Sequence, residues 1–246
     1  MSYRAHIAAL MTAVFVVALA VPASATQAAS RTATTTAPSA IAADRTIAQA
    51  INLAASDLPG WQESPNPPNS TAGSFVVQLA KCTGNPAITT NDDVMDVTSA
   101  DFSKGPIQLS SDVTMVHSHA DALSDKHVLT DPKILGCVDS VSKREFSGQL
   151  PPGERVSYIK SSIFTPSQVI SGSFGLRSNI TLVVKENGIT RTISFVANQI
   201  DFLVGRAEVS LQEFETGKAV PVTAEAALLQ TLDSRAVSLT AGQGGS

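Results

Sequence analysis

The chain has 246 residues, of which 17 are Lys or Arg and 21 are Asp or Glu, so charged residues make up 15%, against roughly 25% in an ordinary soluble protein. The formal net charge is −4, which argues against nucleic acid as the main partner, because that binding needs clustered Lys and Arg to replace the counterions on phosphates. The length is enough for one large domain or two small ones.

The first 25 residues have the pattern of a secretory signal peptide. Arg4 lies in a short polar start, residues 7–20 are apolar apart from Thr12, and small residues precede a predicted cleavage after Ala25. The apolar stretch is shorter than the roughly 20 residues that a helix needs to cross the bilayer core, so we expect cleavage, with a retained anchor as the alternative. The sequence therefore predicts a secreted, extracellular protein without a stable membrane anchor.

The rest of the chain reads as one domain between two disordered ends. Residues 26–43 are rich in Ala, Thr and Ser and have no sustained apolar period, so they cannot offset the entropy lost on ordering, and we predict a disordered tether. Residues 44–239 contain no long linker and are predicted to form a single domain. Residues 240–246 are predicted to be a disordered tail.

The first half of this domain is predicted to be mainly helical. Apolar residues recur at helical spacing, and the pattern Ser118-x-x-Asp121 and the pair Asp131-Pro132 are helix start signals. We predict helices over 47–55, 72–82, 122–129 and 131–145, with strands at 95–102 and 111–117.

Cys82 and Cys137 are the two cysteines of the chain. An even count in an exported protein predicts one disulfide, and two reduced thiols are the alternative. Because Cys82 ends the helix over 72–82 and Cys137 lies on the helix over 131–145, the bond would join two helices.

The second half alternates between apolar and polar residues with a period of two, which predicts strands at 156–164, 179–185, 189–196 and 204–212, followed by a helix over 223–239. In the strand over 204–212, Val209 and Leu211 lie on one side and Ser210 and Gln212 on the other, so we expect the polar side to face solvent. The predicted fold is α+β, a twisted antiparallel sheet of about six strands with helices packed mainly on one face.

Two histidines are the candidate metal ligands. His117 and His119 are two residues apart near a predicted strand end, so their rings would project from one face, with Asp121 or His127 as a third ligand of a catalytic zinc site. Solvated histidines are the alternative. Asn91-Asp92-Asp93 with Asp96 could hold calcium weakly, but it lacks the spacing of a calcium loop, and we favour a turn.

Trp61 and Arg206 are the candidate ligand contacts. The alternative for Trp61, the single tryptophan, is that it packs as an apolar plug after the Pro59-Gly60 turn. The sequence has no Gly-x-Ser-x-Gly elbow, no Cys-x-x-Cys pair and no phosphate-binding glycine loop. We therefore expect a protein that is not an enzyme, is monomeric and needs no cofactor.

Several short motifs together resemble a known group of proteins. They are Ser56 to Trp61, the helix-borne Cys82, Ser111 to His117, Asp131-Pro132 to Cys137, and Val204 to Leu211. They resemble exported actinobacterial proteins of uncharacterised function, which are similar to the extracellular sensor domain of mycobacterial serine/threonine kinases and to related envelope lipoproteins. The resemblance implies an α+β sandwich with a ligand-binding groove between sheet and helices. This chain has one cysteine pair where the kinase sensor has two, and no functional residue carries over to it.

These features lead to a functional hypothesis. We expect a secreted, non-enzymatic binding or sensor-like module of the cell envelope or exterior, which holds a small or lipid-like ligand or an envelope partner. The alternative is a secreted hydrolase that uses the region of His117 and His119.

Overall fold

The computed structural model describes residues 38–65, 72–85, 93–166, 170–186 and 188–241. The helices are α2 (Pro38–Ile51), α3 (Ala72–Thr83), α4 (His119–Thr130), α5 (Ile134–Gln149) and α6 (Val222–Thr240), with a short 3₁₀ helix, η1 (Ala55–Asp57). The strands are β1 (Gln62–Ser64), β2 (Asp93–Thr98), β3 (Asp101–Lys104), β4 (Ile107–Val116), β5 (Arg155–Phe164), β6 (Phe174–Glu186), β7 (Ile189–Val204) and β8 (Ala207–Glu215).

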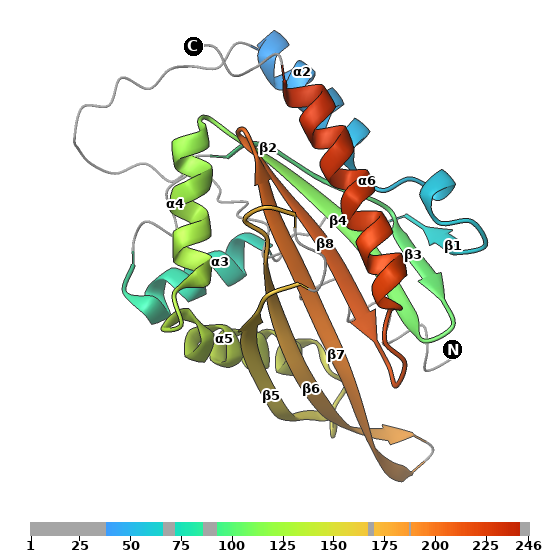
Figure 1. Ribbon diagram of the computed structural model, residues 1–246. Coiled ribbons are helices and arrows are strands. Elements are labelled where there is room, and N and C mark those ends of the chain that lie inside the picture. Colours follow the sequence, from blue (N-terminus) through green and yellow to red (C-terminus); the bar gives the residue numbers. More distant parts are fainter. Residues whose placement is uncertain (1–37, 66–71, 86–92, 167–169, 187, 242–246) are drawn as a thin grey trace.

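The strands form one antiparallel sheet in the order β1-β3-β4-β8-β7-β6-β5, and β2 pairs with β4 beside β3 (Figure 1). The α+β class and the twisted antiparallel sheet are confirmed. The sheet has eight strands rather than about six, because the predicted strand over 95–102 is divided into β2 and β3 and residues 62–64 add β1. Gly205, with φ of +60°, lies in the tight turn between β7 and β8, so β8 begins after the predicted residue 204.

The two faces of the sheet can be told apart along β8. Val209 and Leu211 belong to a core that contains residues of α2 and α6, whereas Phe214, at the opposite parity, packs with Phe146 of α5. Successive side chains of a strand point to opposite faces, so helices cover both faces rather than mainly one. We call the side of Val209 and Leu211 the front face and the side of Ser210 and Gln212 the back face.

The front face of β4, β8 and the end of β7 lies under α2 and α6 and is mainly apolar. Its fully buried residues include Val113, Phe202, Val209, Leu211 and Leu232. Each buried side chain of this size contributes about 1.5–3 kcal/mol relative to an exposed one. This core therefore holds α6 firmly on the sheet.

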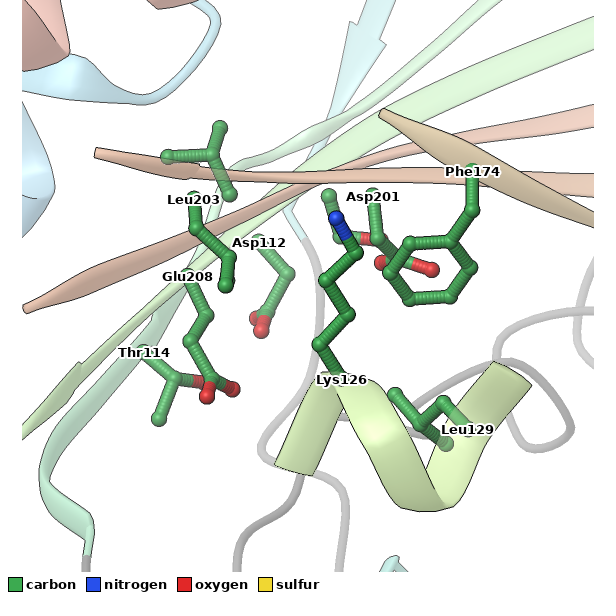
Figure 2. A pocket seen from close by; sticks show the side chains of 10 residues that line it. Asp112, Thr114, Lys126, Leu129, Phe174, Asp201, Leu203 and Glu208 are labelled. Atoms are coloured by element: carbon green, nitrogen blue, oxygen red, sulfur yellow. The ribbon is translucent and has the colours of Figure 1, made fainter. Parts of the chain in front are cut away.

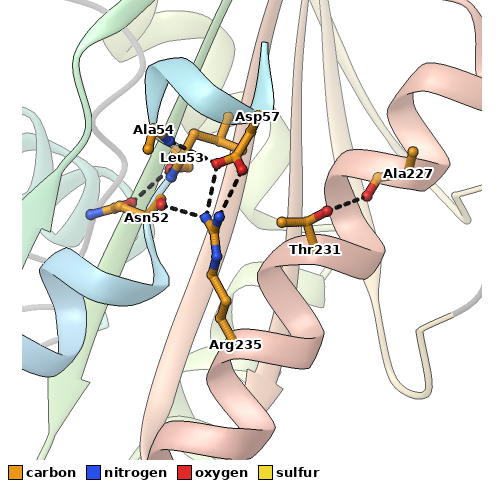
Figure 3. Close-up of polar contacts among 8 residues, drawn as sticks. Asn52, Leu53, Ala54, Asp57, Ala227, Thr231 and Arg235 are labelled. Carbon is orange, nitrogen blue, oxygen red and sulfur yellow. Dashed lines mark hydrogen bonds and ion pairs between the residues drawn. The ribbon is translucent and has the colours of Figure 1, made fainter. Parts of the chain in front are cut away.

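Arg235 fixes α6 to the segment that follows α2 (Figure 3). Its guanidinium donates to both carboxylate oxygens of Asp57, at 2.7 and 2.9 Å, and to the carbonyl oxygen of Asn52 at 2.9 Å. Burial raises the pKa of Asp57, but hydrogen bonds from Arg235 and from the backbone N–H of Ala54 outweigh it, and the pKa lies below its usual 3.8. Asp57 is therefore a carboxylate that Arg235 holds in place at neutral pH.

The back face carries α3, α4 and α5, and the disulfide lies there. Cys82 of α3 and Cys137 of α5 are bonded, with Cα atoms 5.6 Å apart and a sequence separation of 55, which confirms both the predicted pairing and the joining of two helices. In the chain-entropy model a loop of this length gives roughly 4 kcal/mol of stabilisation.

The structure begins before the predicted domain start. Helix α2 starts at Pro38 and includes residues 38–43, which the sequence analysis assigns to the tether. The predicted signal peptide and nearly all of the predicted tail lie outside the described residues. Among the described residues, no helix is long and apolar enough to cross a membrane.

Candidate functional site

The polar side of β8 is buried, contrary to the expectation that it faces solvent. Ser210 and Gln212 are 8% and 4% exposed. They are covered because α4 and α5 pack over the back face. An alternation of period two shows that one side of a strand is apolar and the other polar. It does not show whether a helix covers the polar side.

Helix α4 presents a partly polar surface to the back face. The Ser118 hydroxyl accepts a hydrogen bond from the Asp121 backbone N–H at 3.2 Å, which confirms the predicted start signal. Asp125 and Ala122 are buried, and Lys126, one residue on, reaches over the sheet. The ammonium of Lys126 donates to the carbonyl oxygen of Gly172 at 2.5 Å and lies 6.0 Å from the centre of the Phe174 ring.

Four carboxyl groups lie on the back face near α4, and we call them the carboxyl cluster. They belong to Asp96 of β2, Asp112 of β4, Asp201 of β7 and Glu208 of β8. Strand register places them together, because Asp112 pairs with Ser210, and Ser210 pairs with Asp201. Figure 2 shows Lys126 directed toward the sheet, where three of these carboxyl side chains lie.

Burial and mutual repulsion raise the pKa values within the carboxyl cluster. Burial is the main cause that raises the pKa of Asp112 well above 3.8, and repulsion from Asp96 is the second. Burial also raises the pKa of Asp96, which is hydrogen-bonded to Asp112. Two carboxyl groups can share a hydrogen bond only when one is protonated, so the contact between Asp96 and Asp112 requires one proton for the pair. Burial raises the pKa of Asp201 to about 6, although hydrogen bonds from Gln199 and Ser210 act in the opposite direction.

The cavity beside the carboxyl cluster is too small for an organic ligand. Its volume is about 30 Å³, and it is lined by residues of four strands and α4, including Asp112, Asp201, Glu208 and Lys126. A water molecule needs roughly 10–15 Å³ measured this way, whereas ligand pockets have roughly 300–1,000 Å³. The cluster can therefore hold protons and water.

A larger hollow follows one side of α6, and we call it the α6 groove. Its volume is about 790 Å³, which lies within the range of ligand sites. It is lined by Ile170, Ser171, Leu203, Val204, Gly205, Thr223, Ala226, Ala227, Leu229, Gln230, Asp233 and Val237. Leu203 also lines the small cavity, so the end of β7 separates the two hollows.

The α6 groove exists because one side of α6 carries small residues. Thr223, Ala226, Ala227 and Gln230 recur at spacings of three and four, so they lie on one side of the helix. Alanine leaves room beside the helix that a larger side chain would fill. Asp233 is the charged residue among the described lining residues, and Ser171, Thr223 and Gln230 add uncharged polar groups. The groove therefore offers apolar and polar surface together with one acidic group.

Trp61 and Arg206, the candidate ligand contacts, lie elsewhere. Trp61 is partly buried against the front core, and neither it nor Arg206 lines the groove or the cavity. Arg206 donates to the carbonyl oxygen of Val116 at 3.0 Å and pairs with Asp44 of α2. These contacts join the β7–β8 turn to β4 and α2, and a ligand-binding role for either residue stays a prediction.

The sequence predicts that His117 and His119 lie together near a strand end. Instead β4 ends at Val116, before both residues, and α4 begins at His119. The Nδ1 atom of His119 lies 2.5 Å from the carbonyl oxygen of Gly205. Within the described ranges, no group of three or more His, Cys, Asp or Glu side chains is placed to hold a metal ion. The two histidines therefore have no third protein ligand within those ranges.

Of the residues considered for a calcium site, Asn91 and Asp92 lie outside the described residues.

Sequence reasoning missed both hollows. The carboxyl cluster did leave a signal, because three strands carry polar residues at alternate positions: Asp96 and Thr98, Asp112 and Thr114, and Glu208 and Ser210. Side by side in the sheet, these pairs form one polar patch. The groove left a weaker signal in the small residues along one side of α6.

No family model and no curated protein matches the chain. Among solved structures, the extracellular domain of PknH from Mycobacterium tuberculosis matches with 6% sequence identity over 61% of this chain and 69% of that chain, at a TM-score of 0.33. A TM-score this low supports no inference about this chain.

Proposed function

We propose that this chain is an extracellular, non-enzymatic binding module whose α6 groove holds a small amphipathic ligand. The observation that carries the proposal is the groove itself, about 790 Å³ in volume. An alkyl or ring portion would contact Leu203, Val204 and Leu229, and a hydrogen-bond donor or cationic group would reach Asp233. Ligand sites combine apolar contacts with polar groups that orient the ligand, and this groove is rich in polar groups because Ser171, Thr223 and Gln230 line it together with Asp233.

Two features support an extracellular location. The disulfide between Cys82 and Cys137 is of a kind that persists in oxidising compartments and is rare in the cytosol. The first 25 residues have the charge and apolar pattern of an export signal.

The residues that line the groove favour binding over catalysis. Hydrolytic sites commonly use a nucleophile with an adjacent base, or a pair of carboxyl groups. The described lining residues include one titratable side chain, Asp233. A single carboxylate is suited to orienting a ligand.

Filling the groove tests this proposal. Ala226→Phe places a ring where the ligand would lie, and Ser234→Phe, at an exposed position of the same helix outside the groove lining, is the matched control. Binding of N-phenyl-1-naphthylamine, an uncharged apolar fluorophore, should weaken at least about tenfold in Ala226→Phe and stay close to wild type in the control. Equal binding by both variants, with unchanged circular dichroism, would refute the groove as the site.

A further inference from the structure

The outer half of the front face is not covered by a described helix. In Figure 1, α6 crosses the sheet over β8 and β4, while β5 and β6 lie clear of it, with α5 behind them. Even-numbered residues of β6 from Ile180 to Val184 are buried toward the back, whereas Arg177, Asn179 and Lys185 on the front are exposed. We call the front side of β5, β6 and the first half of β7 the open face.

The open face gathers positive charge in a chain that is acidic as a whole. Between residues 154 and 200 the sequence has five basic residues and two acidic residues, while the formal net charge of the chain is −4. One of the two, Glu154, accepts a hydrogen bond from the backbone N–H of Lys185 at 3.4 Å. Strand register places four of the basic residues on the open face: Arg155 opposite Val183, Lys160 opposite Asn179, Arg177 opposite Ser162, and Lys185 opposite Thr190. They come from two strands and form one stripe along β5 and β6.

Part of this charge is balanced locally. Lys160 lies 3.6 Å from a carboxylate oxygen of Asp139 of α5, yet its side chain is still 63% exposed. Arg177 stacks over the Phe164 ring at 4.7 Å and donates to Asn198 at 2.8 Å, close to Glu213. Arg155 and Lys185 are exposed and make no ion pair with a described residue. These two side chains can bind an anion without breaking an existing ion pair.

An exposed aromatic ring lies between the ends of the stripe. Tyr158 is 51% exposed and stands opposite Thr181, whose hydroxyl oxygen is 3.1 Å from that of Ser194 on the next strand. Alternate residues of a strand are about 7 Å apart, so the ring and the hydroxyls lie roughly one such step from Arg155 and from Lys160. A flat surface with a ring, hydroxyls and flanking cations is suited to a chain of sugars.

We propose that the open face binds a carboxylated polysaccharide. The ring of Tyr158 would pack on the C–H face of one sugar, while the guanidinium of Arg155 would bind a carboxylate through two parallel hydrogen bonds, and Lys185 would add a second cation. A lipid surface would need further large apolar side chains beside the cations, and Tyr158 is the large apolar residue that the described part of this face exposes. The proposal needs an extracellular location but not the α6 groove.

Calorimetric titration of the full chain with polygalacturonate tests the proposal, with neutral dextran, polyglutamate and phosphatidylglycerol vesicles as comparison probes. Polygalacturonate should bind in a salt-sensitive manner and dextran should not. Tyr158→Ala and the double variant Arg155→Ala/Lys185→Ala should each weaken binding at least about tenfold. Lys143→Ala/Lys218→Ala removes the same charge at exposed positions away from the open face and should change affinity less than about twofold.

Each other outcome overturns the proposal. Polyglutamate that binds as tightly as polygalacturonate, with no loss in Tyr158→Ala, would indicate an acidic peptide or charge alone. Vesicles that bind while polygalacturonate does not would indicate a lipid surface. Loss of binding in the control double variant would indicate unspecific attraction. Ala226→Phe should leave polygalacturonate binding unchanged, so failure of the groove and failure of the open face can be told apart.

Discussion

Strands β4 and β8 bury both of their faces, and the two faces are built from different residues. On the front, Val113, Val209 and Leu211 pack under α2 and α6. On the back, Asp112 and Ser210 lie near α4, which brings Lys126 to the same place. A polar stripe on a strand therefore does not mark a solvent face when the covering helix is itself partly polar.

The two faces contribute to stability in different ways. Removal of apolar surface from water stabilises the front at any pH. The back face loses hydration of its carboxyl groups on folding, and it tolerates this because the groups are hydrogen-bonded or protonated. We therefore expect the front to set the size of the free energy of unfolding and the buried carboxyl groups to set its dependence on pH.

The largest expected effect comes from truncating the front core. Leu211→Ala leaves a cavity at a fully buried position and should lower the free energy of unfolding by about 2–5 kcal/mol. The neighbouring Ser210→Ala, on the back, should cost less than about 1.5 kcal/mol. Urea denaturation of both variants at pH 6 measures the contrast, and equal losses would contradict it.

Glu213 is a buried acidic residue on the otherwise mainly apolar front face. It should dominate the pH dependence of the free energy of unfolding on the alkaline side. It is 0% exposed, and burial, followed by repulsion from Glu225, raises its pKa from 4.5 to about 8 despite a hydrogen bond from Asn198. Because the folded state holds this proton more tightly than the unfolded state, stability falls as pH rises from 4.5 to about 8.

Glu213→Gln should remove that fall and raise the free energy of unfolding at pH 8 by about 4 kcal/mol. Denaturation curves at pH 6, 7 and 8 check this. If wild type and variant run parallel across that range, the buried acid does not titrate as inferred.

Asp201 tests the back face in a lower pH window. Its pKa is raised from 3.8 to about 6. The contribution of Asp201 to the free energy of unfolding should therefore fall as pH rises from 4 to 6 and stay constant at higher pH. Asp201→Asn should flatten that window and stabilise the protein by about 3 kcal/mol at pH 7. Thermal unfolding across pH 4–7 measures it, and the same decline in wild type and Asp201→Asn would contradict the inference.

The smallest expected effect is at α4. Lys126→Met removes the hydrogen bond to Gly172 and should cost about 1 kcal/mol at pH 5. At pH 8 more of the carboxyl cluster is charged, and the cost should be larger because a nearby cation is gone. A cost that does not change with pH, measured by urea denaturation, would mean that Lys126 does not interact with the cluster.

Local features of the fold were accessible from the sequence. Ile180 and Leu182 are buried as their alternation predicts, Ser118 caps α4, and Cys82 pairs with Cys137. Each depends on residues close in sequence or, for the cysteines, on a count of two. Local periodicity and capping chemistry are sufficient for such features.

The candidate sites were not accessible because they depend on long-range register. Asp112 and Asp201 lie far apart in the sequence and meet only because β4 and β7 both pair with β8. Arg155 and Lys185 share a face for the same reason. A single sequence does not state strand order, so it could not show these groupings.

Native mass spectrometry of protein purified from the medium of its own host tests whether the α6 groove holds a ligand. We expect wild type and Ser234→Phe each to carry one small ligand per chain, and Ala226→Phe, which fills the α6 groove, to be recovered without it. If Ala226→Phe carried the same ligand in the same proportion, or if wild type were recovered with no ligand at all, the α6 groove would not be the binding site.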